Sequence, residues 1–349
     1  MLRGKRPDVI QITPFWLRRL QRFDLFLPLS DFISQNLVKR RYAKAFQLGK
    51  IGDEIFCLNW ALCPLVLYYN KVVLEKAGID PERPPDTLEE MAEMSIRVSQ
   101  TSENELYGIC LPFDMYEISF LMLYPFFLSF NGGFTDGIGN IHIDTEENIR
   151  ALNWLKDLYL RAGVKKENSI DETRLLFASD QLAFMIDGPY GRGNIRELSG
   201  MGKEFDSHYG ITGFPTGPSG KSESLLLSHA LAIPRQTRNP LEAYQWIEYL
   251  CTDEKNGQIY FEESGMIPGN RDFLQKPFFS SDSFAAVLIK QIETASTDPI
   301  MHPLLLRIIP FLQQAITAAV LHNHDPARSL AFAREAVPTV SKADSLMFF

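Results

Sequence analysis

Residues 62–78 read LCPLVLYYNKVVLEKAG, a continuous apolar run that leads directly into a short helix. Residues 65–69 show no polar alternation and are rich in β-branched and aromatic side chains, so we predict a strand that is buried on both faces. Asn70 ends this strand. Gly78 fits the left-handed position that follows a helix C-terminus, and the prolines of the segment PERPP, 81–85, prevent the helix from continuing.

A second helix is predicted directly after this turn. Thr87 and Glu90 have the spacing of a capping box, in which each side chain accepts a hydrogen bond from the backbone of the other residue. The apolar side chains of Leu88, Met91 and Ala92 then fall on one face of the helix. The predicted order is therefore strand, short helix, proline-rich turn and capped helix.

This order resembles the extracellular carbohydrate-binding proteins of ABC importers, the maltose-binding-protein-like family. The match is LYYNKVVLEKAGIDPERPPDTLEEM, residues 67–91. Two further stretches fit the family pattern: LAFMIDGPY at 182–190, and the series PTGPSGK, LAIP and NPLEAYQWIEYL within 215–250. The resemblance implies an α/β fold with two lobes, a periplasmic-binding-protein-like clamp that closes on its ligand about hinge crossings.

The resemblance also implies where the chain passes between the lobes. Crossings are expected near residues 61–64, near 225–230 and at about 300. The resulting division is a first lobe of 1–61 and 230–300 and a second lobe of 62–229 and 301–349. The strand expected at residues 9–13 lies in the middle of the first lobe in this family. The first lobe is therefore expected to be truncated at the N-terminus and to lack its opening elements.

Local patterns predict three more elements. The apolar residues 118–130 fall short of the roughly 20 residues that a membrane-spanning helix needs, so we expect a buried core helix. A helix should begin near Asp144 or Thr145, with Glu147 and Asp144 forming its cap. Residues 182–186 predict a strand, because they form a short apolar run next to a Gly-Pro turn.

Composition limits the class of protein. A chain of 349 residues with 45% hydrophobic content is long enough for two globular domains. The net charge of −8 disfavours nucleic acid as the main partner, because a phosphate-binding surface needs clustered Lys and Arg. The four cysteines lack CxxC spacing, and residues 136–140 lack the oxygen ligands of a calcium loop. No metal and no cofactor is expected.

The string GPSGKS, residues 217–222, suggests a phosphate-binding P-loop at first sight. A P-loop needs G-x-x-x-x-G-K-S/T, and Pro215 stands where its first glycine would fall. We therefore reject nucleotide binding.

The expected location follows from the resemblance, which implies an extracellular or periplasmic protein. Residues 1–12, MLRGKRPDVIQI, have a basic start but not the apolar segment of a signal peptide, so none is expected in this chain. The expected partners are a sugar or oligosaccharide ligand and the membrane permease subunits of an ABC transporter. The protein is expected to be a monomer without enzymatic activity.

Sugar recognition predicts aromatic rings and carboxylates at the cleft. A sugar presents hydroxyl groups around its rim and C–H groups on its faces, so polar groups bind its edge and rings bind its face. In the resembled family an aromatic residue after the Gly-Pro turn stacks on the sugar, and Tyr190 matches this position. A helix N-terminus alone would also favour Asp114. The predicted ligand-binding residues are Trp16, Trp60, Asp114, Tyr116, Tyr190 and His302, the last at the expected third crossing.

Two alternatives to the transporter component stay open. A carbohydrate-active enzyme would need an acid and a base about 5 to 9.5 Å apart, a distance that sequence does not supply. The chain has neither an eightfold strand-helix series nor a nucleophile elbow, which disfavours this alternative. A non-transport sugar sensor that retains the clamp fold is the other alternative. The preferred hypothesis is the carbohydrate-binding component of an ABC transporter.

Overall fold

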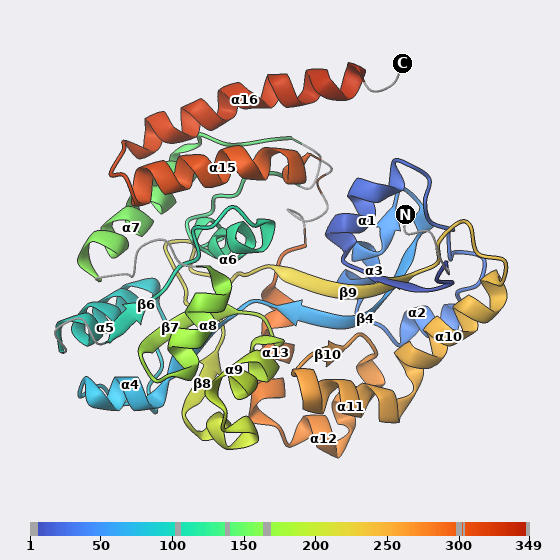
Figure 1. The fold of residues 1–349 in the computed structure, drawn as a ribbon, viewed down its shortest axis with the longest axis horizontal. Helices are drawn as coiled ribbons and strands as arrows, with labels where there is room; N and C mark the ends of the chain where they lie inside the picture. The colour runs from blue at the N-terminus through green and yellow to red at the C-terminus, as the bar shows by residue number, and fades with distance from the viewer. Residues whose placement is uncertain are drawn as a thin grey trace.

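The computed structural model describes residues 6–101, 106–136, 140–162, 169–297, 302 and 304–346. Its longer strands form two four-stranded sheets (Figure 1). The first sheet has the antiparallel order β1-β9-β4-β10, and the second has the order β6-β7-β5-β8, in which β6 and β7 run parallel. The strands are β1 (Ile10–Ile12), β4 (Cys57–Pro64), β5 (Val66–Asn70), β6 (Tyr107–Ile109), β7 (Leu182–Asp187), β8 (Tyr209–Thr212), β9 (Leu226–Ala232), β10 (Ile267–Pro268) and a separate hairpin of β2 (Lys50–Ile51) and β3 (Glu54–Ile55).

Helices surround each sheet. We call the first sheet with α1, α2, α3 and α10 the first lobe, and the second sheet with α4 to α9, α15 and α16 the second lobe (Figure 1). The helices of the first lobe are α1 (Pro14–Gln21), α2 (Gln35–Lys39), α3 (Ala43–Leu48) and α10 (Pro240–Thr252). Those of the second are α4 (Lys71–Lys76), α5 (Leu88–Thr101), α6 (Glu117–Leu128), α7 (Glu146–Arg161), α8 (Ile170–Ala178), α9 (Gly191–Ser199), α15 (Leu305–Val320) and α16 (Pro326–Leu346).

Most of the remaining helices lie between the two lobes. They are α11 (Glu254–Ser264), α12 (Pro277–Ser280), α13 (Ser283–Thr294) and the 3-10 helix η2 (Arg271–Gln275), whereas the 3-10 helix η1 (Gly202–Ser207) packs on α9 and β8 of the second lobe. Helix α13 contacts β4 of the first sheet and β8 of the second, and α11 contacts both α10 and α9. These helices therefore connect the lobes. In Figure 1 they lie below the long strands β4 and β9.

The stretch 62–91 has the predicted structure. All residues of β5 are buried, as expected for a strand covered on both faces. The side chain of Asn70 caps α4 by accepting a hydrogen bond from Val73 N at 3.0 Å, and its amide donates to Asp180 Oδ1 at 2.7 Å. Gly78 follows α4 with a φ of +65°. One polar side chain thus ends the strand, starts the helix and ties both to the neighbouring loop.

The predicted capping box of α5 is present. Glu90 N donates to Thr87 Oγ1 at 3.1 Å, and Thr87 N donates to Glu90 Oε2 at 3.2 Å. The predicted cap of α7 is wrong, because Thr145 rather than Asp144 accepts the hydrogen bond from Asn148 N, at 3.3 Å. The carboxylate of Asp144 instead lies 2.7 Å from Arg334 of α16. Asp144 thus directly precedes the N-cap and contacts a distant helix.

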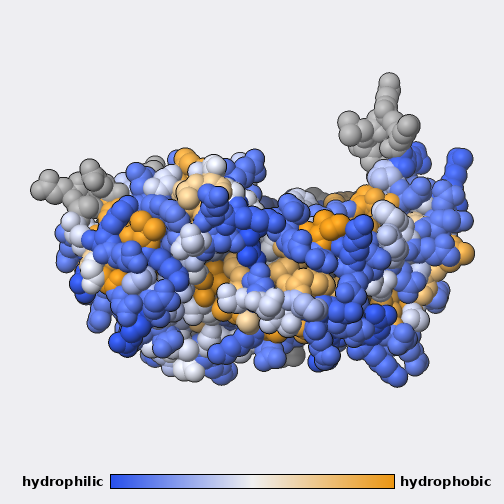
Figure 2. All heavy atoms as spheres, turned by 90° about the horizontal axis from the view of Figure 1, so that it is seen from below, coloured by the Kyte–Doolittle hydropathy of each residue, from blue (hydrophilic) through white to orange (hydrophobic). Residues whose placement is uncertain are grey.

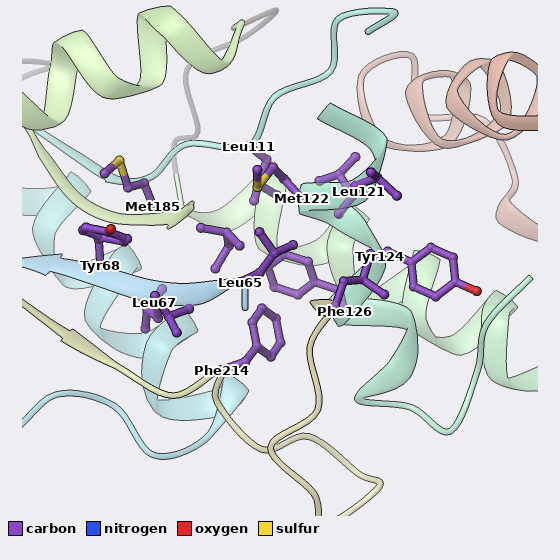
Figure 3. Packing of buried hydrophobic residues seen from close by; sticks show 14 of the residues in the cluster. Leu65, Leu67, Tyr68, Leu111, Leu121, Met122, Tyr124, Phe126, Met185 and Phe214 are labelled. Atoms are coloured by element: carbon purple, nitrogen blue, oxygen red, sulfur yellow. The ribbon is translucent and has the colours of Figure 1, made fainter. Parts of the chain in front are cut away.

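The apolar residues predicted as a core helix form α6, which is buried on almost every side. In Figure 3 its neighbours include Leu65, between β4 and β5, and Phe214, in the segment after β8; the ring centroids of Phe126 of α6 and Phe214 are 5.2 Å apart. At about 25 cal/mol per Å² of apolar surface removed from water, such packing is the main stabilising contribution to the second lobe. It also fixes the position of the first turn of α6, which faces the first lobe.

Three segments cross between the lobes side by side. Strand β4 ends at Pro64, opposite Leu226 of β9, and Leu65 N then donates to Leu225 O at 3.0 Å. The third segment joins them through Ser296, whose carbonyl accepts from Leu226 N at 2.9 Å. The expected third crossing at about residue 300 falls on residues 298–301, which lie outside the described residues. The exact lobe boundaries stay a prediction.

The surface is mainly polar on the face seen in Figure 2, with smaller apolar areas at the left, near the middle and towards the upper right. Within the part of the chain that the structure describes, none of the helices is long and apolar enough to cross a membrane.

Candidate ligand-binding cleft

A cavity of about 420 Å³ lies between the two lobes. Its walls come from the N-terminal halves of α1, α6 and α8, from the crossing strands β4 and β9, and from the turn that ends at Tyr190. The volume is typical of small-molecule sites, which range over about 300 to 1,000 Å³. Because both lobes and the crossing strands contribute, a movement of one lobe relative to the other would change its shape.

Apolar side chains make up most of the wall. The first lobe contributes Phe15 and Leu48, and the second contributes Leu121 and Ile170. Leu226 of β9 closes the side formed by the crossing strands. Each residue lies in the first or last turns of a helix or at a strand end, so the packing of that element holds the side chain in place.

The charged group deepest in the wall is the Arg174 guanidinium. Its Nε donates to Asp187 Oδ2 at 2.8 Å and its Nη2 donates to Asp187 Oδ1 at 3.2 Å. Arg174 is 9% exposed and Asp187 is fully buried. Burial alone would lower the pKa of Arg174, but the charge and hydrogen bonds of Asp187 outweigh it and raise that pKa above its ordinary value. The guanidinium is therefore already neutralised by the protein.

Tyr190 lies against this ion pair. The Cζ atom of Arg174 is 5.2 Å from the centroid of the Tyr190 ring, so the cation covers one face of the ring. The Tyr190 hydroxyl is buried close to the carboxylate of Asp187. Burial, together with the charge of Asp187, raises the pKa of Tyr190 well above its usual range. The phenol is therefore a neutral group.

A second ion pair joins the lobes at the rim of the cavity. Arg19 Nη1 of α1 lies 3.8 Å from Glu117 Oε1 of α6, and its guanidinium carbon lies 4.8 Å from the centroid of the Trp16 ring. The two charged side chains are 46% and 36% exposed, so solvent screens their attraction and the pair adds little to stability. Because of this pair, the Glu117 carboxylate, like the Arg174 guanidinium, has an oppositely charged side chain beside it.

The crossing strands contribute two polar side chains that are also engaged. Ser228 Oγ donates to Ala61 O at 2.8 Å and accepts from Asn59 Nδ2 at 2.6 Å. His229 Nδ1 shares a hydrogen bond of 3.1 Å with the hydroxyl of Tyr260. Burial lowers the pKa of His229, so its ring is neutral at neutral pH.

The structure brings three of the predicted ligand-binding residues together in this cavity. Trp16 lies in the first turn of α1, Tyr116 directly precedes α6 and Tyr190 directly precedes α9. Tyr116 is 69% exposed and Trp16 is 39% exposed, whereas Tyr190 is half-buried. Aromatic rings from both lobes therefore face the same space.

The other three predicted residues lie elsewhere. Trp60 packs on Tyr260, with ring centroids 4.2 Å apart. Asp114 lines a separate hollow of about 780 Å³ beside α15, and its Oδ1 accepts a hydrogen bond from Tyr116 N at 3.0 Å. His302 is 7% exposed, and its Nδ1 accepts from Leu304 N at 3.2 Å. A direct role of these three in the cavity is not supported by their positions.

Sequence reasoning missed Arg174 and His229 as cavity residues, and it did not include Glu117, a neighbour of Asp114, among the predicted ligand-binding residues. Arg174 follows Asp171 and precedes Asp187, and a charged pair 13 positions apart carries no helical or strand periodicity. The signal that could have been used is an arginine on the otherwise apolar side of a helix that leads into a buried strand. Within the described residues, no group of three or more His, Cys, Asp or Glu side chains is arranged to hold a metal ion.

Comparison with known proteins relates the chain to transporter-associated binding proteins. A family model described as bacterial extracellular solute-binding protein matches residues 1–257. A probable ABC transporter-binding protein of Deinococcus radiodurans is 26% identical, over 78% of this chain and 66% of its own. The maltodextrin-binding protein of Bacillus subtilis is 24% identical, over 73% of this chain and 60% of its own. The matched part of the chain thus spans less than two thirds of the length of each of these two relatives.

Solved structures share the fold. A solute-binding protein of Thermotoga lettingae bound with α-D-tagatose has a TM-score of 0.86 at 21% identity, over 97% of this chain and 86% of the other. A maltose-bound protein of T. maritima has a TM-score of 0.81, also at 21% identity, over 95% and 84%. These similarities establish the two-lobed α/β architecture.

Proposed function

The chain belongs to the bacterial extracellular solute-binding proteins, and on this premise we propose that it binds a sugar or oligosaccharide between its lobes for delivery to an ABC permease. The observation that supports this most directly is the cavity between the lobes, where aromatic rings from both lobes meet. Rings suit the C–H faces of a sugar, and closure of the lobes would bury the ligand. The relatives whose names specify a maltodextrin or a galactooligosaccharide favour the same ligand class. The site of action would be outside the cytoplasmic membrane.

The arrangement favours binding over catalysis. Among the described residues that line the cavity, Glu117 supplies the one carboxylate, and Arg19 lies beside it. Asp187 is fully buried behind Arg174. Hydrolysis of a glycosidic bond by the common mechanism needs two carboxyl groups that flank the bond. Transport as a monomer and docking to permease subunits are part of the same proposal.

A ligand screen tests this function. The melting temperature should rise with an oligosaccharide and not with amino acids or divalent cations, because a ligand that binds only the folded state stabilises it by about 2.7 kcal/mol at 100 times its Kd. Differential scanning fluorimetry with the three compound classes, followed by calorimetry on positive sugars, measures this. A response confined to amino acids or divalent cations would refute the proposal.

Removal of the Tyr190 ring should weaken sugar binding by roughly 10- to 100-fold. Contact between the ring and a sugar face removes apolar area from water, which stabilises the complex by about 25 cal/mol per Å². Loss of the ring therefore corresponds to about 1 to 3 kcal/mol. Tyr190→Trp should preserve or improve the affinity, because the larger ring offers more area. Isothermal calorimetry with one identified sugar measures the three proteins.

The matched control for this prediction is Trp246→Ala on α10. Trp246 is 51% exposed, stacks on Tyr249 and lies outside the cavity, so its loss should leave sugar affinity unchanged. Equal affinity of the wild type and Tyr190→Ala would show that Tyr190 does not contact the ligand.

A further inference from the structure

The wall of the cavity offers more apolar surface than a bare sugar can use. Phe15, Leu48, Ile118, Leu121 and Leu226 line it from three sides, with contributions from both lobes and from the crossing strands. A free monosaccharide carries a hydroxyl group on nearly every carbon, and each hydroxyl that loses water without finding a partner opposes binding. A ligand that fills this space must therefore have an apolar part beside its polar part.

The neutral polar groups of the wall are largely engaged with the protein. Thr13 Oγ1 accepts a hydrogen bond from Trp16 N at 3.3 Å, and Ser228 binds the backbone of β4. His229 uses Nδ1 for the hydroxyl of Tyr260. The hydroxyl of Tyr190 is buried beside the carboxylate of Asp187, which is itself fully buried, so this hydroxyl offers little to a ligand. The wall can satisfy few hydroxyl groups at once.

The charges of the wall are balanced, which indicates an uncharged ligand. Arg174 donates two hydrogen bonds to Asp187, and Glu117 lies opposite Arg19. An anionic sugar would have to compete with Asp187 for the guanidinium or lie near two carboxylates. Among the described residues of the wall, each charged side chain therefore has an oppositely charged side chain beside it.

We infer that the ligand of this cavity is an uncharged glycoside with an apolar aglycone, such as an aryl group, rather than a bare sugar. The aglycone would lie against Leu48, Ile118 and Leu121, and the sugar would lie against the aromatic rings near Tyr190. This inference rests on the proposed sugar-binding function and specifies the ligand class of the same site.

The test compares matched pairs of glycosides that differ only in the aglycone. Methyl and 4-nitrophenyl glycosides of several neutral hexoses and pentoses, in both anomers, are titrated into the full chain by calorimetry. For at least one sugar, the 4-nitrophenyl glycoside should bind about 10-fold more tightly than its methyl partner. That factor corresponds to burial of roughly 55 Å² of additional apolar area.

A conservative variant locates the aglycone. Ile118→Thr keeps the branched shape but places a hydroxyl group in the wall, so the preference for the 4-nitrophenyl glycoside should fall about threefold. Ile259→Thr on α11 makes the same change at a helix position that is 50% exposed and outside the cavity, and it should leave the preference unchanged. Melting curves of both variants check that they are folded.

The outcomes separate this inference from the proposed function. If methyl and 4-nitrophenyl glycosides bind equally, or if only underivatised oligosaccharides bind, the inference is wrong and sugar binding stands. Binding of 4-nitrophenol alone with no glycoside or sugar bound would contradict both. An aryl preference that Ile118→Thr reduces and Ile259→Thr does not would establish the inference.

Discussion

Replacement of Arg174 by methionine should lower the free energy of unfolding by about 3 to 5 kcal/mol, which is the usual cost of removing one partner of a buried ion pair. Asp187 is fully buried and would keep one described hydrogen bond, from Gly188 N at 2.7 Å. Methionine fills much of the same volume, so the loss would report the unpaired carboxylate rather than an empty space. Urea denaturation followed by circular dichroism at pH 7 measures the effect.

Two companion variants check the cause of this loss. Arg150→Met removes a partner of Glu147 where both side chains are exposed, at 55% and 37%, and should cost less than about 1 kcal/mol. The double variant Arg174→Met/Asp187→Asn should be more stable than Arg174→Met, because asparagine can still accept from Gly188 N without a buried charge. A loss for Arg174→Met no larger than that for Arg150→Met would contradict the prediction.

The parts of the fold that could be predicted are those with local causes. The burial of β5, the cap at Asn70 and the capping box of Thr87 and Glu90 each depend on residues a few positions apart. The cap of α7 was predicted wrongly because two adjacent residues, Asp144 and Thr145, can each cap a helix, and Thr145 takes that place while Asp144 pairs with Arg334 of α16. The local pattern does not decide between two neighbouring capping residues.

The candidate site shows the same limit. Trp16, Tyr116 and Tyr190 were predicted because aromatic rings suit the face of a sugar and, for Tyr190, because of the family resemblance. Each adjoins or begins a helix, and the fold brings these helix starts to one cavity. Asp114 has the same local context but lines another hollow. The backbone of its loop is fixed by Gln313 of α15, whose Nε2 donates to Asp114 O and to Tyr116 O, both at 2.8 Å. The packing of α15 therefore determines which hollow Asp114 lines.

The contact between Arg174 and Asp187 was beyond sequence reasoning for a related reason. Helix α8 and strand β7 can pack in several relative positions, and the one that brings these charges together is set by the surrounding apolar core. The family resemblance of three sequence stretches therefore predicted the class of protein, whereas the balance of charges that limits its ligand became visible in three dimensions.

A second charge cluster, at Asp206, connects the second lobe to the helices between the lobes. Its carboxylate accepts hydrogen bonds from Arg192 Nη2 at 2.8 Å and from Arg196 Nε at 2.8 Å. Arg192 also donates to Asp282 Oδ2 at 3.0 Å, at the N-cap of α13, and Arg196 donates to Glu262 O at 3.1 Å in α11. The two arginines thus join α9 to α11 and α13.

Asp206→Asn should lower the free energy of unfolding by about 2 to 3 kcal/mol at pH 7, and this difference should shrink in acid. The value lies below that for Arg174 because the Asp206 side chain is 25% exposed. Burial acts to raise the pKa of Asp206, but the hydrogen bonds from Arg196 and Arg192 outweigh it and hold the pKa below its ordinary value of 3.8. Its stabilisation is therefore present above that value and is lost as the pH falls through the lower pKa of the folded state.

Urea denaturation of the wild type and Asp206→Asn at pH 7, pH 5 and pH 3 measures this dependence. The difference between them should be nearly equal at the first two pH values and smaller at pH 3, since protonation then begins to remove the charge in the wild type as well. Asp157→Asn is the matched control, because Asp157 pairs with Arg161 on the exposed face of α7, and it should change stability by less than about 0.5 kcal/mol. A difference for Asp206→Asn that grows towards pH 3 would show that the carboxylate destabilises the folded state, and the two arginines would then owe their positions to α11 and α13 alone.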